Sequence, residues 1–393
     1  MAPAPPAGWR VALHDVATTL APAFDRVIAF DLEGRPSSWF DGGVTLKRSL
    51  ASAVVGRRTV DGVRVRWTAP REEAQRRFVQ AIDVARAAAD ALAAGDLPLT
   101  GADADELADR LTRATAWTPD RLAAEAERYA AAYRPIPILP PDQYGAIVLQ
   151  ASFGCSWNRC TYCSFYQDRA FEVRAPEAFA AHLDDVAALL GRSAAARRSL
   201  FLADGNALVL SNARLRPLFA AARERFPGRR FAGFVDVFSG ERKPADAWRE
   251  LAGWGLRRVA IGIETGHDPL LAYLNKPGSA DEATAFVRTL KEAGLEVAAI
   301  LMVGAGGLRY ADGHLRDSAE LLRRLPLGSG DVVYLSPFVR HAGSRYDAAA
   351  RDDGLRDLTR EERDAQEAAL REAARAAVPR SRIARYSIDE FVY

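Results

Sequence analysis

The chain has 393 residues, of which 49% are hydrophobic and 26% charged, a length that suits one large domain with appendages or two to three domains. Its 53 basic and 51 acidic residues leave a formal charge of +2, so neither nucleic acid nor another polyanion is indicated as a partner. No uncharged apolar run approaches the roughly 18 residues of a membrane span, and the amino terminus lacks the pattern of a signal peptide. The three cysteines are clustered and make no disulfide framework, so we expect a cytoplasmic protein without membrane contact.

The first part of the chain predicts a small α+β region. Residues 26–67 contain apolar runs separated by Gly-containing turn signals, which is typical of β-structure. A helix is expected from Pro70 to about Ala94 and a second from Thr118 to Tyr133. The proline-rich residues 135–141 cannot be helical and predict a linker, so residues 1–142 form a region of their own.

After the linker, short apolar strands alternate with amphipathic helices. The predicted strands are Ala146–Ser152, Leu200–Ala203, Phe231–Val237, Arg258–Glu264, Val297–Val303 and Val332–Pro337. The predicted helices lie near 176–190, 213–225, 245–253, 280–293 and 315–324, with another near 359–376 in the tail. This alternation predicts a parallel sheet buried on both faces, either doubly wound or an incomplete barrel. In both architectures, ligands bind at the carboxyl ends of the strands.

All three cysteines fall within residues 155–163, directly after the first of these strands. Thiolates are ligands for zinc and for iron–sulfur clusters, and three of them leave one iron of a [4Fe-4S] cluster free for another ligand. Two other interpretations stay open at this point. The thiols could be small buried hydrophobic groups, or they could form a zinc site with a histidine, of which the next along the chain is His182.

The segment 153–165 resembles the cluster loop of the radical S-adenosylmethionine (SAM) superfamily, with one residue more than usual between the first two cysteines. Tyr162 stands in the aromatic position before the last cysteine. The resemblance implies a partial (β/α)6 radical SAM barrel over residues 143–340, a small α+β amino-terminal region and a helical carboxy-terminal extension at 341–393. It also implies SAM and a [4Fe-4S] cluster as cofactors. The cluster would be held by Cys155, Cys160 and Cys163.

The second strand ends in Asp204, Gly205 and Asn206. By itself this is the pattern of an Asp-Gly turn. In the resembled family, a short acidic and Gly-rich segment at this place accepts hydrogen bonds from the SAM ammonium group, which can only donate. The resemblance therefore implies that these three residues contact SAM through side chains or backbone carbonyls.

The fourth strand ends in Glu264, within a sequence similar to that of the coproporphyrinogen dehydrogenase and methylthiotransferase branch. A glutamate that closes a buried strand needs a partner or a ligand. The resemblance implies a contact to SAM, and a structural pair with an arginine is the alternative. Lys276 follows, and it is expected either to meet a carboxylate of SAM or substrate or to be a solvated residue at a helix end.

Other strand ends carry weaker candidates. Val303 and Gly304 end the fifth strand, where the resemblance implies that the backbone flanks adenine. His314 is expected to lie in a surface loop, and Asp236, at the end of the third strand, is a further candidate for the site.

The resemblance implies an enzyme that cleaves SAM reductively to a 5′-deoxyadenosyl radical, which abstracts hydrogen from a substrate that the sequence does not identify. A low-potential electron donor of the flavodoxin or ferredoxin type is the implied partner. The alternative is a haem-carrier-like delivery protein that binds cluster and SAM without turnover, and a zinc protein is a third hypothesis. Because every cofactor element follows the linker, residues 1–142 are expected to govern the substrate and not radical formation.

Overall fold

The computed structural model describes residues 8–60, 62–99, 101–388 and 393. The chain divides into two compact units. The first takes its described residues from Met1–Ile136, Asp185–Arg197 and Val392–Tyr393, and the second from Pro137–Asp184 and Arg198–Phe391.

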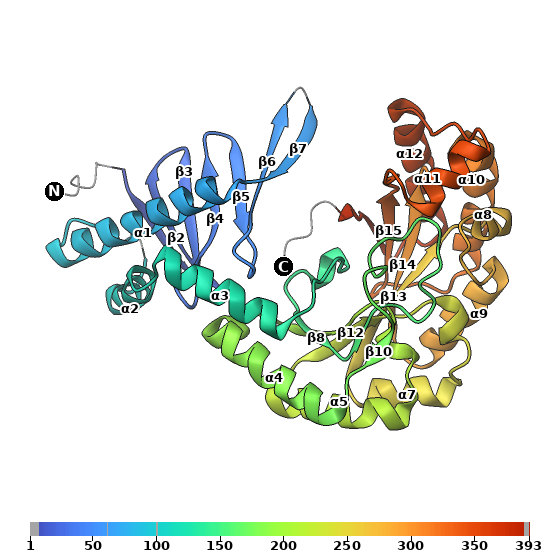
Figure 1. The fold of residues 1–393 in the computed structure, drawn as a ribbon, viewed down its shortest axis with the longest axis horizontal. Coiled ribbons are helices and arrows are strands. Elements are labelled where there is room, and N and C mark those ends of the chain that lie inside the picture. Colours follow the sequence, from blue (N-terminus) through green and yellow to red (C-terminus); the bar gives the residue numbers. More distant parts are fainter. Residues whose placement is uncertain (1–7, 61, 100, 389–392) are drawn as a thin grey trace. The chain divides into compact units, whose positions relative to one another are not determined.

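The first unit is built on a seven-stranded antiparallel sheet in which every strand pairs with the next one along the chain (Figure 1). Its strands are β1 (Arg10–His14), β2 (Ala17–Ala23), β3 (Arg26–Asp31), β4 (Pro36–Asp41), β5 (Val44–Arg48), β6 (Val54–Val60) and β7 (Val63–Thr68). Its helices are α1 (Arg71–Ala94), α2 (Ala104–Thr115) and α3 (Pro119–Ala132). The predicted α+β region is confirmed, whereas β1, β2 and α2 were not predicted. The two strands are short and carry little apolar alternation. Helix α2 does carry a helical signal that was missed, because Leu107, Leu111 and Ala114 recur on one face and Asp103 caps its first turn.

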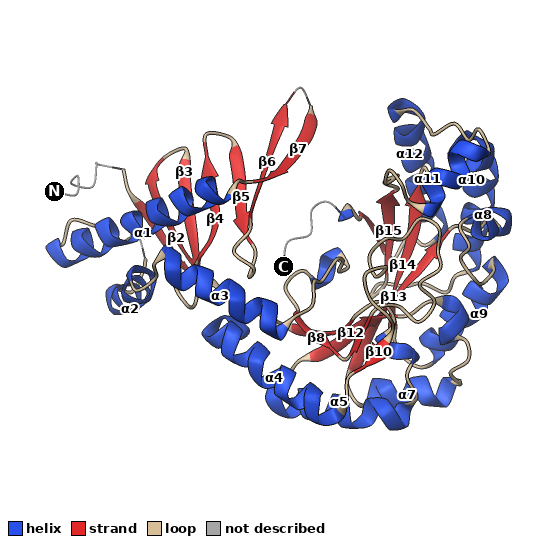
Figure 2. Cartoon of the chain, in the orientation of Figure 1, coloured by secondary structure: helices blue, strands red, loops and turns tan. Residues whose placement is uncertain are grey.

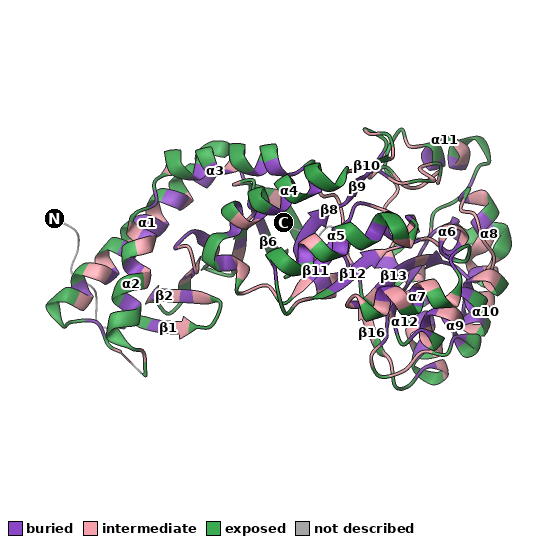
Figure 3. Ribbon diagram, turned by 90° about the horizontal axis from the view of Figure 1, so that it is seen from below, coloured by how far each residue is buried: buried purple, intermediate pink, exposed green. Residues whose placement is uncertain are grey.

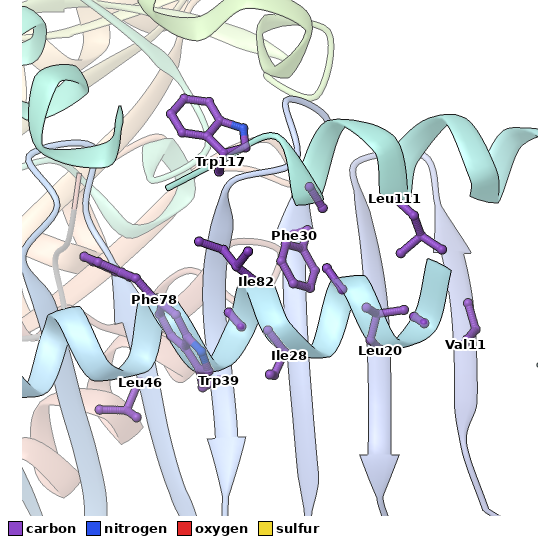
Figure 4. Close-up of a cluster of buried hydrophobic side chains, with 14 of the residues drawn as sticks. Val11, Leu20, Ile28, Phe30, Trp39, Leu46, Phe78, Ile82, Leu111 and Trp117 are labelled. Atoms are coloured by element: carbon purple, nitrogen blue, oxygen red, sulfur yellow. The ribbon is translucent and has the colours of Figure 1, made fainter. Parts of the chain in front are cut away.

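Helix α1 packs on one face of this sheet (Figure 4). Its buried positions recur with helical spacing, and among them Phe78 lies with its ring centroid 6.1 Å from that of Trp39 on β4. Leu20, Ile28 and Leu46 of neighbouring strands belong to the same cluster of buried side chains. This cluster is a core of the first unit's own.

A buried guanidinium ties the segment 185–197 into the first unit. Arg35 is fully buried, and its side chain forms ion pairs with Asp31 at 2.6 Å and Glu125 at 2.7 Å. The Nη1 atom of Arg35, which pairs with Glu125, also donates to the backbone carbonyl of Leu189 at 2.8 Å. A buried charge is costly without partners. The two carboxylates and the Leu189 carbonyl therefore stabilise the buried Arg35 guanidinium, and the Leu189 carbonyl links the segment 185–197 to it.

The second unit contains a seven-stranded sheet whose strands are all parallel, in chain order along the sheet (Figure 2). Its strands are β8 (Ile147–Gln150), β11 (Ser199–Ala203), β12 (Arg230–Phe234), β13 (Leu256–Glu264), β14 (Glu296–Val303), β15 (Val332–Pro337) and β16 (Arg382–Arg385). Longer helices connect or follow the strands: α4 (Pro176–Leu190), whose residues from 185 on are counted with the first unit, α5 (Asn212–Arg225), α7 (Ala245–Gly253), α9 (Ala280–Glu292), α10 (Gly307–Arg324) and α12 (Arg360–Ala377). All six predicted strands are present and the partial barrel is confirmed, and the tail adds the unpredicted strand β16.

The burial pattern explains the parallel architecture (Figure 3). Seven of the eight residues of β14 are buried, as expected for a strand covered on both faces. Helix α9 buries only the stripe that includes Ala283, Phe286 and Leu290, and its other residues are partly or fully exposed. Helix α10 begins at Gly307 and not near residue 315, because the glycines that suggest a loop in the sequence lie in and before its first turn.

Short elements occupy the carboxyl edge of this sheet. They are β9 (Ser152–Phe153), β10 (Glu172–Val173), α6 (Val237–Gly240), α8 (Asp268–Tyr273) and α11 (Arg345–Asp352), with a short 3-10 turn at Ala207–Val209. Two further 3-10 turns, Pro141–Gln143 and Gly191–Ala194, precede strands β8 and β11 instead. In the part of the chain that the structure describes, no helix is both long enough and apolar enough to cross a membrane.

Candidate functional site

The three cysteines lie on a loop that is closed at its base by a pair of strands. Ser152 and Phe153 of β9 pair antiparallel with Val173 and Glu172 of β10, so residues 154–171 form the loop between them. Gly154 begins the loop with a φ of +75°, and a Cβ there would lie 2.8 Å from the carbonyl oxygen of Ala170. The loop therefore needs a glycine at this point.

The far part of the loop is held by two short helices. The backbone N–H of Thr161 donates to the carbonyl of Leu274 at 2.9 Å, after the end of α8. Its own carbonyl accepts from the N–H of Tyr346, in α11, at 3.0 Å. Asn275 adds a bond from its side-chain Nδ2 to the carbonyl of Arg159 at 2.9 Å. Contacts from segments more than 100 residues away thus shape the cysteine loop.

Cys155, Cys160 and Cys163 are free and partly exposed. Burial raises the pKa of Cys160 to about 12 and that of Cys163 to about 11, and Lys276 opposes part of the rise at Cys160. Among the described residues, no three His, Cys, Asp or Glu side chains converge on one point as ligands of a single ion would. A [4Fe-4S] cluster binds each cysteine through a different iron, so its ligands need not converge in this way. Three free thiols on one loop are a donor set that fits such a cluster.

Asp204 and Gly205 contact the base of the cysteine loop. Asp204 is 1% exposed, and its carboxylate accepts from Gln150 Nε2 at 3.0 Å and from the backbone N–H of Gly154 at 3.1 Å. Arg169 Nη1 lies 3.4 Å from the same carboxylate. The Gly205 N–H donates to the Gly154 carbonyl at 3.1 Å. The contacts of these two residues, whose contact with SAM stays a prediction, hold the start of the loop in place.

Asn206 joins the cysteine loop to the end of β12. Its Nδ2 donates to Ser156 Oγ at 2.8 Å and to the carboxylate of Asp236, and Ser239 Oγ lies 3.4 Å away. The Asn206 Oδ1 accepts from the backbone N–H of Asp236 at 3.3 Å. Asp236 in turn caps α6 through the N–H of Ser239. The structure thus brings Asn206 and Asp236 together in one polar network beside the loop.

Glu264, Tyr162 and Lys276 meet at the carboxyl end of β13. The Tyr162 hydroxyl donates to Glu264 Oε1 at 3.0 Å, and Lys276 Nζ donates to the same oxygen at 3.2 Å. Burial lowers the pKa of Lys276, but the charge of Glu264, together with Cys160, Asp236 and the hydrogen bond to Glu264, more than offsets burial and raises this pKa above its ordinary value. Glu264 Oε2 has no hydrogen-bond partner within the described ranges. One carboxylate oxygen is therefore available to a ligand.

The backbone at Glu264 has a left-handed conformation, with a φ of +69°, at an irregularity in the pairing of β13 with β14. Such a conformation is unfavourable for a residue with a side chain and needs support from its surroundings. Gly262 supplies part of the space, because a Cβ there would lie 2.2 Å from Glu264 Oε1. Position 266 needs a glycine for a different reason, because a Cβ added there would lie 2.4 Å from the carbonyl oxygen of Asp317 in α10.

His314 supports the same segment from α10. It is fully buried, with Nε2 2.8 Å from the carbonyl of Met302 and Nδ1 2.7 Å from the Thr265 hydroxyl. Because a carbonyl only accepts, Nε2 carries the proton and Nδ1 accepts from Thr265. The surface-loop position expected for His314 is wrong, since α10 begins before it and packs it against β14. Lys276 is not a solvated lysine either, as its side chain is 11% exposed and paired with Glu264.

Val303 and Gly304 lie at the carboxyl end of β14, on the same sheet edge as Glu264. The Val303 carbonyl accepts from Phe338 N–H at 2.8 Å, and Gly304 N–H donates to Gln366 Oε1 at 2.7 Å. Gly304 has a φ of +87°, which a glycine adopts without strain. The tail helix α12, which carries Gln366, thus fixes the loop that was predicted to flank adenine.

A tyrosine of the tail carries a buried hydroxyl without a partner in the described part of the protein. Tyr386 follows β16 and packs with Ala260, Ile300 and Tyr334, which lie on one face of neighbouring strands. It is 1% exposed, and its hydroxyl has no hydrogen-bond partner in the described part of the protein. A buried hydroxyl without a partner is unfavourable, so a bound ligand or water is expected to reach it. The sequence did not single out Tyr386, because it directly follows the unpredicted strand of the tail.

Comparisons with known proteins add to this geometry. No curated protein matches the sequence. Among solved structures, the chain is similar to the cobalamin-dependent SAM radical enzyme OxsB, with 14% identity and a TM-score of 0.40 over 66% of this chain and 34% of that one. It is also similar to the radical SAM methyltransferase TsrM from Kitasatospora setae, with 15% identity and a TM-score of 0.42 over 56% of this chain and 44% of that one. It is similar as well to coproporphyrinogen III oxidase HemN from Escherichia coli, with 15% identity and a TM-score of 0.40 over 60% of this chain and 54% of that one.

The chain spans about a third of the length of OxsB and about half of that of HemN. The family model described as the radical SAM superfamily matches residues 149–322, a range that contains the cysteine loop, Asp204 and Glu264. Residues 149–322 of this chain therefore belong to the radical SAM superfamily.

Proposed function

We propose that this protein is a radical SAM enzyme. The observation that carries the proposal is the loop with three free cysteines at the carboxyl edge of a parallel sheet, beside the Tyr162–Glu264–Lys276 contact. Cys155, Cys160 and Cys163 would hold a [4Fe-4S] cluster, which supplies the electron that cleaves SAM to methionine and a 5′-deoxyadenosyl radical.

Glu264 is the residue proposed to contact SAM most directly. Its free Oε2 can accept from an ammonium or ribose hydroxyl, since both of these groups donate hydrogen bonds. Lys276 and Tyr162 both donate to Oε1, so they hold the carboxylate in one orientation. Binding of the ligand then needs little reorganisation of these side chains.

The remaining predicted residues are proposed to position and enclose the cofactors. Asp204 and Gly205 hold the start of the cysteine loop, and Asn206 aligns Ser156 of that loop with Asp236. Val303 and Gly304 are proposed to offer backbone to the adenine ring. A low-potential electron donor is the proposed partner, and residues 1–142 are proposed to govern a substrate that is not identified.

The test is anaerobic reconstitution with iron and sulfide, followed by incubation with SAM and dithionite. Wild-type protein should hold about four irons and four sulfides per chain and should form 5′-deoxyadenosine. Replacement of any of Cys155, Cys160 or Cys163 by Ala should abolish this product, whereas Ser164→Ala, an exposed change on the same loop, should not. A triple Cys→Ala variant that retained a full cluster would refute the assignment.

The same experiment separates catalysis from carriage. Cluster-loaded protein that binds SAM but never forms 5′-deoxyadenosine under strong reductant would indicate a delivery protein. Stoichiometric zinc without sulfide would indicate a zinc protein.

A further inference from the structure

Aromatic and arginine side chains of the cysteine loop, of α6 and its end, and of α11 contact one another in a chain. Trp157, on the loop, lies with its ring centroid 6.1 Å from that of Phe238 on α6. The guanidinium of Arg159 lies 5.4 Å from the Trp157 ring centroid, and that of Arg242 lies 4.0 Å from the Phe238 centroid. Arg345 Nη1 donates to the Arg159 carbonyl at 3.4 Å. We name these five residues the arginine rim.

The three arginines of the rim are exposed, and none forms an ion pair in the described part of the chain. Arg340, on the same edge of the sheet, differs in that it forms ion pairs with two carboxylates. Glu241 precedes Arg242 and is exposed, yet no ion pair joins the two within the described residues. The rim therefore presents three arginines that form no ion pair in the described residues, around two partly exposed aromatic rings, and Glu241 is the acidic neighbour of Arg242.

We propose that the arginine rim is the docking surface for an acidic one-electron donor protein that carries a flavin or an iron–sulfur centre. The proposal rests on the proposed function. Trp157 is two residues from Cys155, so a partner seated on the rim lies against the loop that receives the electron. The reduced donor loses one electron, the group held by the cysteines gains it, and no covalent bond forms or breaks.

The size and character of the rim favour this partner. Electron-transfer complexes use small interfaces, and complementary charges speed their formation more than they tighten it. Aromatic side chains with arginines are typical of the centre of a protein interface. A nucleic-acid surface would need a longer run of basic groups, because such proteins neutralise many phosphates, commonly about 6–10.

The binding test compares two charge-reversed proteins, each full-length and cluster-loaded. The first carries Arg159→Glu, Arg242→Glu and Arg345→Glu. The matched control carries Arg214→Glu, Arg223→Glu and Arg375→Glu, three exposed helical arginines that form no ion pair in the described residues. The probe is a fluorescently labelled, strongly acidic flavodoxin, and a plant-type ferredoxin is the second probe.

Fluorescence anisotropy at low salt should show a roughly ten- to hundredfold weaker Kd for the rim variant and less than about a twofold change for the control. Added salt should weaken wild-type binding more steeply than that of the rim variant, because screening acts on the attraction that the variant has lost. Equal binding of wild-type protein and rim variant would overturn the proposal.

The activity test uses two reductants. With reduced flavodoxin, the rim variant should form 5′-deoxyadenosine roughly ten- to hundredfold more slowly than wild type, and with dithionite at the same rate. If wild-type protein forms no 5′-deoxyadenosine with either reductant, the proposed function is refuted. The anisotropy measurement alone then tests whether the rim binds the donor.

A labelled single-stranded oligonucleotide completes the test. If the rim variant loses binding to the oligonucleotide but keeps its binding to both acidic donors, the rim is a nucleic-acid surface and the proposal is wrong. Wild-type protein that cleaves SAM with dithionite but binds neither donor would overturn it as well.

Discussion

Glu264 is the residue on which the proposed SAM site depends most. Its backbone is held in the left-handed region and its carboxylate receives Tyr162 and Lys276 on one oxygen. Strained conformations at strand ends are retained where the surroundings hold them, and they concentrate at functional sites. The second oxygen is the group that a ligand would use.

Glu264→Gln should weaken SAM binding without loss of the cluster. Loss of a charge-assisted hydrogen bond costs about 1.5–3 kcal/mol, which corresponds to roughly ten- to hundredfold in affinity. The measurement is a titration of cluster-loaded protein with SAM, and Glu241→Gln, an exposed change, serves as the control. Unchanged affinity in a folded Glu264 variant would assign Glu264 a structural role.

His314 should make stability depend on pH. Burial lowers its pKa from 6.5 to about 4, so the folded protein holds it neutral. The stability that the fold has with a neutral His314 is complete above about pH 6.5. It is lost as the pH falls toward 4, because the unfolded chain binds a proton at a higher pH than the folded protein does. The loss should reach about 3 kcal/mol at most.

Urea unfolding of wild type and His314→Gln between pH 4 and 7 checks this dependence. The variant should show a flatter decline in the free energy of unfolding, and His341→Gln, at an exposed histidine, should follow wild type. Parallel curves for wild type and the His314 variant would contradict the prediction.

The cysteine loop is the element that brings the site together. Its base is set by β9 and β10 and by the buried carboxylate of Asp204, and its far part is set by α8 and α11. A loop fastened at both places can hold three thiols in a defined arrangement before any cofactor binds. This preorganisation reduces the entropy that cluster assembly must offset.

Asp204→Asn should loosen the loop. The new amide presents a donor where Gly154 N–H and Arg169 already donate, so the change should cost about 1.5–3 kcal/mol of stability. Trypsin should then cleave after Arg159 or Arg169 several-fold faster. Asp168→Asn, which removes only the exposed partner of Arg169, is the control. Equal resistance of wild type and the Asp204 variant would show that Asp204 does not anchor the loop.

At the scale of the whole molecule, all the predicted cofactor residues lie in the second unit, and the first unit has a core of its own. Asp142 belongs to the barrel, because it accepts from Tyr334 at 2.6 Å and pairs with Arg258. A truncation that starts at Pro137 therefore keeps these contacts, whereas one that removes Asp142 with the residues before it would lose them.

A truncated protein that begins at Pro137 should bind the cluster and still form 5′-deoxyadenosine from SAM. It should unfold at lower urea than the full chain, because residues 185–197 lose the bonds that Arg35 makes to them. The measurements are iron content, product formation and urea unfolding. Soluble, cluster-loaded truncated protein that cannot cleave SAM would place part of the cofactor site before Pro137.

The sequence by itself determined the features that depend on local pattern. The six barrel strands and their helices follow from short-range apolar periodicity, which burial imposes directly on neighbouring residues. The cysteine spacing and the glutamate that ends β13 are equally local, so both could be singled out without coordinates. Strands β1 and β2 could not, because they are short and carry too weak an apolar alternation, whereas α2 was missed although Leu107, Leu111 and Ala114 recur with helical spacing.

Only the tertiary structure decided which of these residues meet. The contact of Tyr162 with Glu264, the bonds of Asn275 and Tyr346 to the cysteine loop, and the burial of His314 join positions far apart in the chain. The seventh strand β16 and the orphan hydroxyl of Tyr386 likewise depend on where the tail returns to the sheet. Such contacts depend on strand register and on packing between distant segments, and a local sequence pattern determines neither of them.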